Sequence, residues 1–143
     1  MDAKSTSVDK IMLTLFEHIT EDLTDFEKNK VVPMIVDRFA RKYRKGEIGK
    51  EHAVKNAKIR SAINRAMEIN QQRYRLKEVK LRKMMSIIRT QGLVLFLCSS
   101  SKGYYIARTK DEVLECIHSL EQRIRTQQEV VDALKKQSQI NMQ

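Results

Sequence analysis

A short segment near the middle of the chain carries the side chains best suited to contact another molecule. Val79, Lys83 and Ser86 recur at intervals of three or four residues, which places them on one face of a helix, and Arg82 flanks that face. Arginine and lysine donate hydrogen bonds to guanine or phosphate, serine contacts either, and valine can meet the methyl group of thymine. The spacing therefore predicts a helix that reads the major groove of duplex DNA; a solvated basic face is the alternative.

Three more basic residues flank this face. Lys80 lies beside it, and Lys77 and Arg89 lie at its two ends, where we expect contact with phosphate rather than with bases. Val79 has a second interpretation, because it could instead cover the junction with the preceding helix.

The polar stretch that follows supplies another set of donors. Ser100, Ser101 and Lys102 offer hydroxyl groups and a cation to phosphate or to the minor groove. An ordinary polar turn fits the same residues equally well, because Gly103 makes such a turn easy. Stacking on single-stranded bases is disfavoured, since only 6% of the residues are aromatic and none is Trp.

The net charge favours a polyanionic partner because it is unevenly distributed. Residues 38–89 hold 17 basic and 4 acidic side chains, a net charge of +13, whereas the other residues hold 11 and 14, a net of −3. Solubility requires no such segregation, although a solvated basic face remains possible. The segregated charge is typical of a protein that binds nucleic acid.

Catalytic and metal-binding chemistry finds no support in the residue pattern. The three histidines and two cysteines lack the spacing of metal ligands; Cys116 and His118, two positions apart on a predicted helix, diverge. The carboxylates at Asp25, Glu27 and Asp111 have no histidine or lysine in a catalytic arrangement, so they are interpreted as helix caps. We therefore expect no enzyme, no cofactor and no metal.

Three predicted helices precede the helix that carries the basic face. The first covers residues 8–20, which show an amphipathic pattern. The capping box Thr24–Glu27 opens a second segment, in which Pro33 predicts a kink or break near Val32. Asn56 is expected to cap the next helix. Leu81, Met84, Met85 and Ile88 form the buried stripe of the helix that carries the basic face, and Gly92 ends it.

The periodicity changes after Gly92. Residues 93–98 are predicted to form a buried strand, 99–103 a turn and 104–107 a second strand in which one of Tyr104 and Tyr105 is buried. Three short helices followed by a β-hairpin predict a mainly α protein with a small hairpin, a winged helix-turn-helix. We expect an N-terminal tail with a short helix over 1–22, the winged-helix domain over 23–108, and a long C-terminal helix within 109–143.

The predicted C-terminal helix carries a heptad pattern that favours dimerisation. The expected dimerisation residues alternate by four and three positions: Leu120, Ile124, Gln127, Val131 and Leu134. We expect the domain to bury the first half of the helix and the second half to need a partner, which is a second copy of the chain or the segment 8–20.

Several stretches resemble small winged-helix proteins of bacterial phages and prophages. They are Val79–Met84 with Ile88–Leu93, the hairpin Ser99–Ile106, Asp111–Leu114 and Ser119–Arg123. Weaker likeness touches Leu23–Glu27, Pro33 and Gly49–Val54, so the resemblance covers residues 20–137. One departure is the connection Glu68–Arg75, which is longer than a tight helix-turn-helix turn. The resemblance implies DNA binding in a phage or mobile element.

Two functional hypotheses follow. The first is a winged-helix protein that binds double-stranded DNA, as a homodimer, in transcription regulation or replication initiation. The alternative is an adaptor that captures a host or phage replication or defence protein without reading DNA. The resemblance implies a bacterial host, in whose cytoplasm we expect either protein to act. The longest apolar run, 93–98, is too short to cross a membrane.

Overall fold

The computed structural model describes residues 23–140, and the predicted helix 8–20 lies outside this range. The described chain divides into two compact units, with the boundary between Arg108 and Thr109. The protein is mainly helical and contains one small antiparallel sheet. Among the described residues, no helix combines the length and the apolar character needed to cross a bilayer.

The first unit begins with two helical segments that follow each other directly. A π-helical turn, η1 (Glu27–Val31), leads into α2 (Val32–Arg44). The capping box is confirmed, because the Glu27 N–H donates to Thr24 Oγ1 at 3.1 Å and the Thr24 N–H donates to Glu27 Oε1 at 2.9 Å. Pro33 does not break the helix: the chain widens into a π turn just before it, which accommodates the missing donor.

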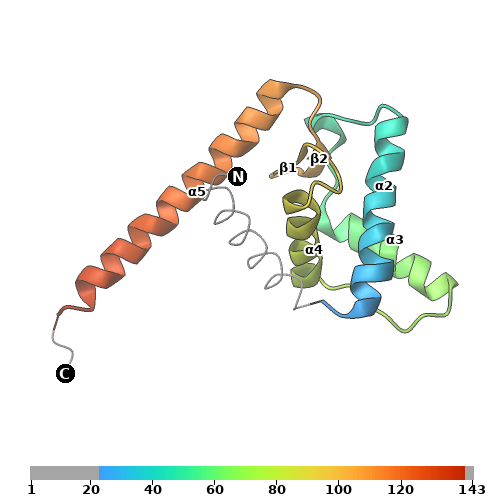
Figure 1. Ribbon diagram of the computed structural model, residues 1–143, viewed down its shortest axis with the longest axis horizontal. Helices are drawn as coiled ribbons and strands as arrows, with labels where there is room; N and C mark the ends of the chain where they lie inside the picture. Colours follow the sequence, from blue (N-terminus) through green and yellow to red (C-terminus); the bar gives the residue numbers. More distant parts are fainter. Residues whose placement is uncertain (1–22, 141–143) are drawn as a thin grey trace, which may run out of the picture. The chain divides into compact units, whose positions relative to one another are not determined.

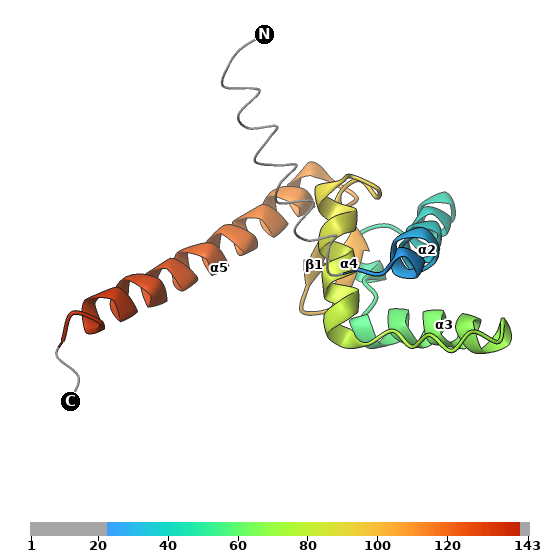
Figure 2. The ribbon, with the colours of Figure 1, turned by 60° about the horizontal axis from the view of Figure 1, so that its bottom comes forward.

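Two more helices complete the helical part of the unit. After a short 3-10 turn, η2 (Lys50–His52), come α3 (Asn56–Ile69) and α4 (Glu78–Thr90). Figures 1 and 2 show α2 and α3 on the same side of α4. Asn56 is not the cap that we expected: Lys55 occupies that position without a side-chain hydrogen bond, and Asn56 instead accepts from Arg60 Nε at 2.6 Å.

Helix α4 buries its apolar face completely. Leu81, Met84, Met85 and Ile88 are each at most 1% exposed, as their spacing predicted. The helix ends in a Schellman motif, in which the Leu93 N–H donates to the Ile88 carbonyl at 3.0 Å and Gly92 has a φ of +64°.

The sheet consists of β1 (Leu97–Ser100) and β2 (Gly103–Ile106), joined by a two-residue turn. The prediction of a buried strand over 93–98 is wrong for its first four residues. Phe96 has a φ of +61°, which an extended strand does not allow, so pairing begins only at Leu97. Leu93, Leu95 and Phe96 are 44%, 65% and 61% exposed.

A third extended segment pairs with the hairpin. Val54 forms an isolated bridge to Tyr104, with reciprocal N–H···O bonds of 2.8 Å. Gly103 permits this approach, because a Cβ at that position would lie 2.3 Å from the Val54 carbonyl oxygen and φ is +120°.

The second unit contains the helix α5 (Lys110–Gln137), which lies within the predicted range 109–143. Thr109 caps it by accepting a hydrogen bond from the Glu112 N–H at 3.2 Å. On α5 itself, Ile117, Leu120 and Ile124 are 43%, 39% and 65% exposed.

Candidate nucleic-acid interface

Helix α4 separates an apolar face from a polar one along its whole length. On the outward side, Val79, Arg82 and Ser86 are exposed and Lys83 is half-buried. Arg82 lies 3.7 Å from Glu78, an exposed pair one turn apart that contributes little to stability. Ser86 donates to the Arg82 carbonyl at 3.2 Å. The structure therefore brings these four predicted residues together on one helical face.

Two predicted interface residues also make contacts within the first unit. Lys80 is half-buried, and its Nζ lies 3.7 Å from Glu27 Oε1. Arg89 is also half-buried: its guanidinium carbon lies 5.5 Å from the centroid of the Tyr104 ring, and its Nε and Nη2 are buried without a hydrogen-bond partner. Lys80 supports the base of α4, and Arg89 covers the hairpin. The exposed face of α4 does not include them.

The hairpin tip is exposed at its centre. Ser101 and Lys102 form the turn and are exposed, whereas Ser100 is half-buried and accepts a hydrogen bond from the Lys102 N–H at 3.1 Å. Tyr105 is buried, as we expected for one of the two tyrosines, and Tyr104 is half-buried under Arg89. The tip offers one cation and one hydroxyl group to a ligand.

A buried network of hydrogen bonds and one ion pair links the start of α4 to the start of η1. Glu27 is only 3% exposed, and it accepts a hydrogen bond of 2.5 Å from the Tyr74 hydroxyl. Burial alone would raise the pKa of Glu27, but the hydrogen bonds from Thr24 and Tyr74 and the charge of Lys80 outweigh it and hold the pKa below its usual value. Burial, together with Glu27, raises the pKa of Tyr74.

The long connection between α3 and α4 is fixed at a second point. The Asn64 side chain accepts from the Leu76 N–H at 2.7 Å and donates to the Leu76 carbonyl at 3.1 Å. Leu76 itself is 1% exposed. The connection is therefore longer than a tight turn yet firmly held, and it fixes Lys77, the exposed residue that precedes α4.

One basic surface was not predicted as a site. Arg38, Arg41, Lys42 and Lys45 share one face of α2 and meet Lys58 of α3 around a cavity of about 300 Å³. The sequence does contain a sign of this surface. Three residues of α2 and the C-cap Lys45 lie at the helical spacing i, i+3, i+4, i+7.

Neither a metal site among the described residues nor a related protein is found. Across residues 23–140, no group of three or more His, Cys, Asp or Glu side chains is arranged to hold a metal ion. Comparison of the chain with protein families, with curated proteins and with solved structures finds no match in any of the three.

Proposed function

We propose that the protein binds double-stranded DNA through the exposed face of α4 and the hairpin tip. The observation that carries the proposal is the division of α4: its apolar face is fully buried, while Val79, Arg82, Lys83 and Ser86 form the other face in the most basic part of the chain. A helix held in this way presents donors to base edges without having to rearrange. Lys77 and Lys102 are the proposed phosphate contacts.

The order of the elements supports a winged-helix interpretation of the first unit. Helix α2 is followed by the extended Val54, by α3 and α4, and then by the hairpin with which Val54 pairs. In this interpretation α3 and α4 form the helix-turn-helix pair, and the turn at Ser101–Lys102 is the wing. The proposed setting is a phage or prophage, in transcription regulation or replication initiation in the cytoplasm of a bacterial host.

We also propose that α5 forms a parallel two-stranded coiled coil with a second copy. In heptad notation Ile117, Ile124 and Val131 occupy a positions, while Leu120 and Leu134 occupy d positions, together with Gln127. β-branched residues at a with leucine at d favour two parallel strands. Parallel pairing brings the starts of both α5 helices, and hence both attached DNA-binding units, to the same end of the coiled coil.

Duplex binding at several salt concentrations tests the central proposal. If about six phosphates are neutralised, the logarithm of the affinity should fall against the logarithm of the salt concentration with a slope of about −5. Arg82→Ala should weaken binding to a preferred sequence by about 1–3 kcal/mol, and Lys102→Ala should weaken all sequences about equally. Arg44→Ala, an exposed cation beside the apolar groove on α2, is the matched control.

An adaptor function is the second candidate, and one feature favours it. Tyr43, Leu95 and Phe96 expose 64%, 65% and 61% of their surface beside a largely apolar groove of about 440 Å³ between α2 and residues 93–96. Such a groove can accept the apolar face of a partner helix, here one from a replication or defence protein. Absence of duplex binding at low salt, with the protein folded, would favour this function over DNA binding.

A further inference from the structure

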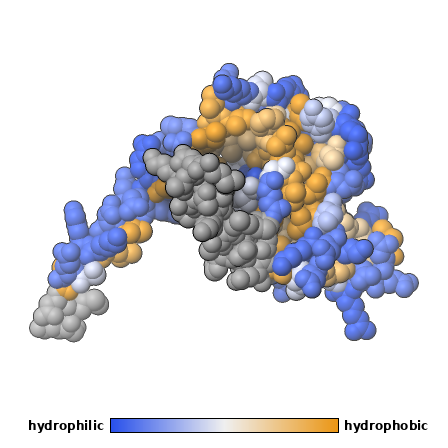
Figure 3. Space-filling model, in the orientation of Figure 1, coloured by the Kyte–Doolittle hydropathy of each residue, from blue (hydrophilic) through white to orange (hydrophobic). Residues whose placement is uncertain are grey.

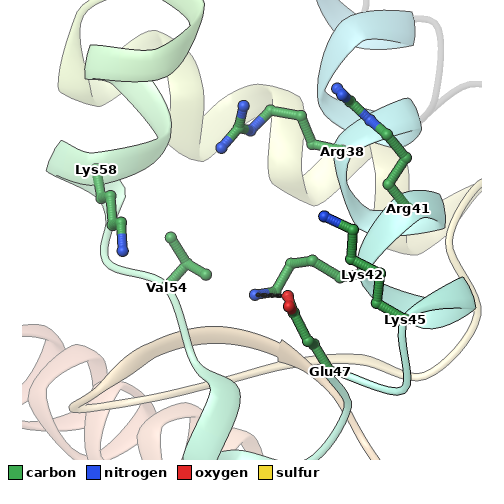
Figure 4. A pocket seen from close by; sticks show the side chains of 7 residues that line it. All are labelled: Arg38, Arg41, Lys42, Lys45, Glu47, Val54 and Lys58. Atoms are coloured by element: carbon green, nitrogen blue, oxygen red, sulfur yellow. Dashed lines mark hydrogen bonds and ion pairs between the residues drawn. The ribbon is translucent and has the colours of Figure 1, made fainter.

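The unpredicted basic surface on α2 and α3 is concave rather than flat. Four basic residues line the cavity from the second half of α2 and its C-cap: Arg38, Arg41, Lys42 and Lys45. Lys58, in the first turn of α3, lies across from them, and Val54 lines the cavity from the segment that leads into α3, as Figure 4 shows. The cavity of about 300 Å³ is at the lower end of the range for small-ligand sites.

The charges around this cavity are poorly balanced. Among residues 23–140, Glu47 is the one carboxylate in the lining, and it pairs with Lys42 at 3.4 Å. Asp37 pairs with Arg41 at 3.2 Å, with both side chains more than half exposed. Within residues 23–140, the side chains of Arg38, Lys45 and Lys58 form no ion pair or hydrogen bond. Three unpaired cations around one cavity repel one another, and a bound anion would offset this repulsion.

The geometry also concentrates the positive potential. A hollow lined by charges of one sign focuses the field and raises the local concentration of oppositely charged ligands. The start of α3 adds the positive end of its helix dipole, and no side chain caps that start. Arginine and lysine together suit phosphate oxygens, arginine through its fork and lysine through its point charge.

We propose that this pocket binds a ligand that carries at least two phosphate groups. The lining has a formal surplus of four positive charges, or three when Asp37 is included. A terminal phosphate carries about −1.5 to −2 charges at pH 7, so two phosphates match that surplus. No residue of α4 or of the hairpin lines the pocket. The site is therefore separate from the proposed DNA-reading face and does not depend on it.

Thermal denaturation with inorganic pyrophosphate tests the pocket directly. At constant ionic strength, pyrophosphate should raise the melting temperature with a saturable concentration dependence, and orthophosphate should do so more weakly. The double variant Arg38→Gln/Lys58→Gln should bind pyrophosphate at least about tenfold more weakly. Without ligand it should melt no lower than the parent, because both side chains lack partners. Arg44→Gln, a cation on α2 outside this pocket, should keep the parent affinity.

Measurements of duplex binding distinguish the two possible sources of the phosphate groups, a DNA backbone and a free ligand. If they belong to a DNA backbone, the double variant should reduce the salt slope of duplex binding by about 2, at about −0.9 per phosphate contact. If the slope is unchanged while pyrophosphate binding is lost, the ligand is a free di- or triphosphate. Both results support the site.

The proposal is overturned if pyrophosphate gives no saturable stabilisation and the duplex slope is unchanged. It is also overturned if Arg44→Gln weakens pyrophosphate binding as much as the double variant does, because the effect would then be general electrostatics. Failure of the DNA-reading proposal is distinguishable, since Arg82→Ala affects duplex binding and leaves pyrophosphate binding intact.

Discussion

Helices α4 and α5 carry the same kind of apolar stripe, but the stripe of α4 is buried and that of α5 is exposed. Leu81 and Ile88 of α4 are 0% exposed, whereas Ile124 and Leu134 of α5 are 65% and 57% exposed. Helix α4 packs against α2 and α3 of its own unit, while Figure 3 shows hydrophobic side chains at the surface among the hydrophilic ones of α5. A periodic stripe thus identifies which face of a helix is apolar, but not whether its partner belongs to the same chain.

The largest expected effect concerns the partner of the α5 stripe. Truncation after Arg125 removes Val131 and Leu134 and leaves the first unit intact. If α5 pairs two copies, the truncated protein should stay folded, sediment as a monomer, and bind a DNA with two half-sites about 10²–10⁴-fold more weakly, because the second half-site is no longer tethered.

Sedimentation of the full-length chain provides the control for this truncation. A monomer at tens of micromolar would end the dimer proposal, and the DNA target would then be a single site. Unfolding of the truncated chain would instead show that the stripe contributes to folding within one chain.

The same substitution on both helices measures the difference between the stripes directly. Leu81→Ala should lower the free energy of unfolding of the first unit by about 2–5 kcal/mol, because it leaves a cavity in a fully buried site. Leu134→Ala should leave that free energy unchanged. Tyrosine fluorescence during urea unfolding reports on this unit, since all four tyrosines precede Arg108. Equal losses from both substitutions would contradict the distinction.

Local signals predicted much of this architecture. The capping box at Thr24 and Glu27 and the buried stripe of α4 depend on residues close in sequence, and the structure confirms them. The rest depends on features that a helical spacing does not encode. Lys80 lies close to Glu27, far away in the chain, and Phe96 leaves the extended conformation, so the predicted strand begins only at Leu97.

The candidate site was predicted only in part for the same reason. The exposed face of α4 follows from the spacing within one helix, so Arg82 and Ser86 lie where the pattern placed them. Arg89 could not be placed from spacing, because its position depends on the Tyr104 ring. The pocket at Lys58 requires α3 to approach α2, and no local pattern predicts that approach.

The buried network around Glu27 predicts a moderate, pH-dependent effect of mutation on the free energy of unfolding. Glu27→Gln should cost about 1–3 kcal/mol near neutral pH, because the amide cannot satisfy all the donors around it. The folded state lowers the pKa of Glu27, so its stabilising contribution is complete above the usual value of 4.5 and is lost as the pH falls through the lowered pKa. Urea unfolding at pH 7 and at pH 3 should therefore show a smaller difference between parent and variant in acid. A constant difference would exclude this charge effect.

The smallest expected effect separates the two interpretations of Val79, an apolar residue of α4 that is 57% exposed. If it meets a thymine methyl group, Val79→Ala should leave the free energy of unfolding within about 0.5 kcal/mol of the parent, since alanine favours a helix and no core contact is lost. Discrimination at one thymine of the preferred duplex should fall by about 1 kcal/mol, measured by competition between duplexes that differ at that base pair. A loss of stability above 1 kcal/mol with unchanged discrimination would mean that Val79 covers the junction with α3. In that case Val79 would resemble the buried stripe of α4 in its function, and the α4 face that contacts DNA would consist of Arg82, Lys83 and Ser86 alone.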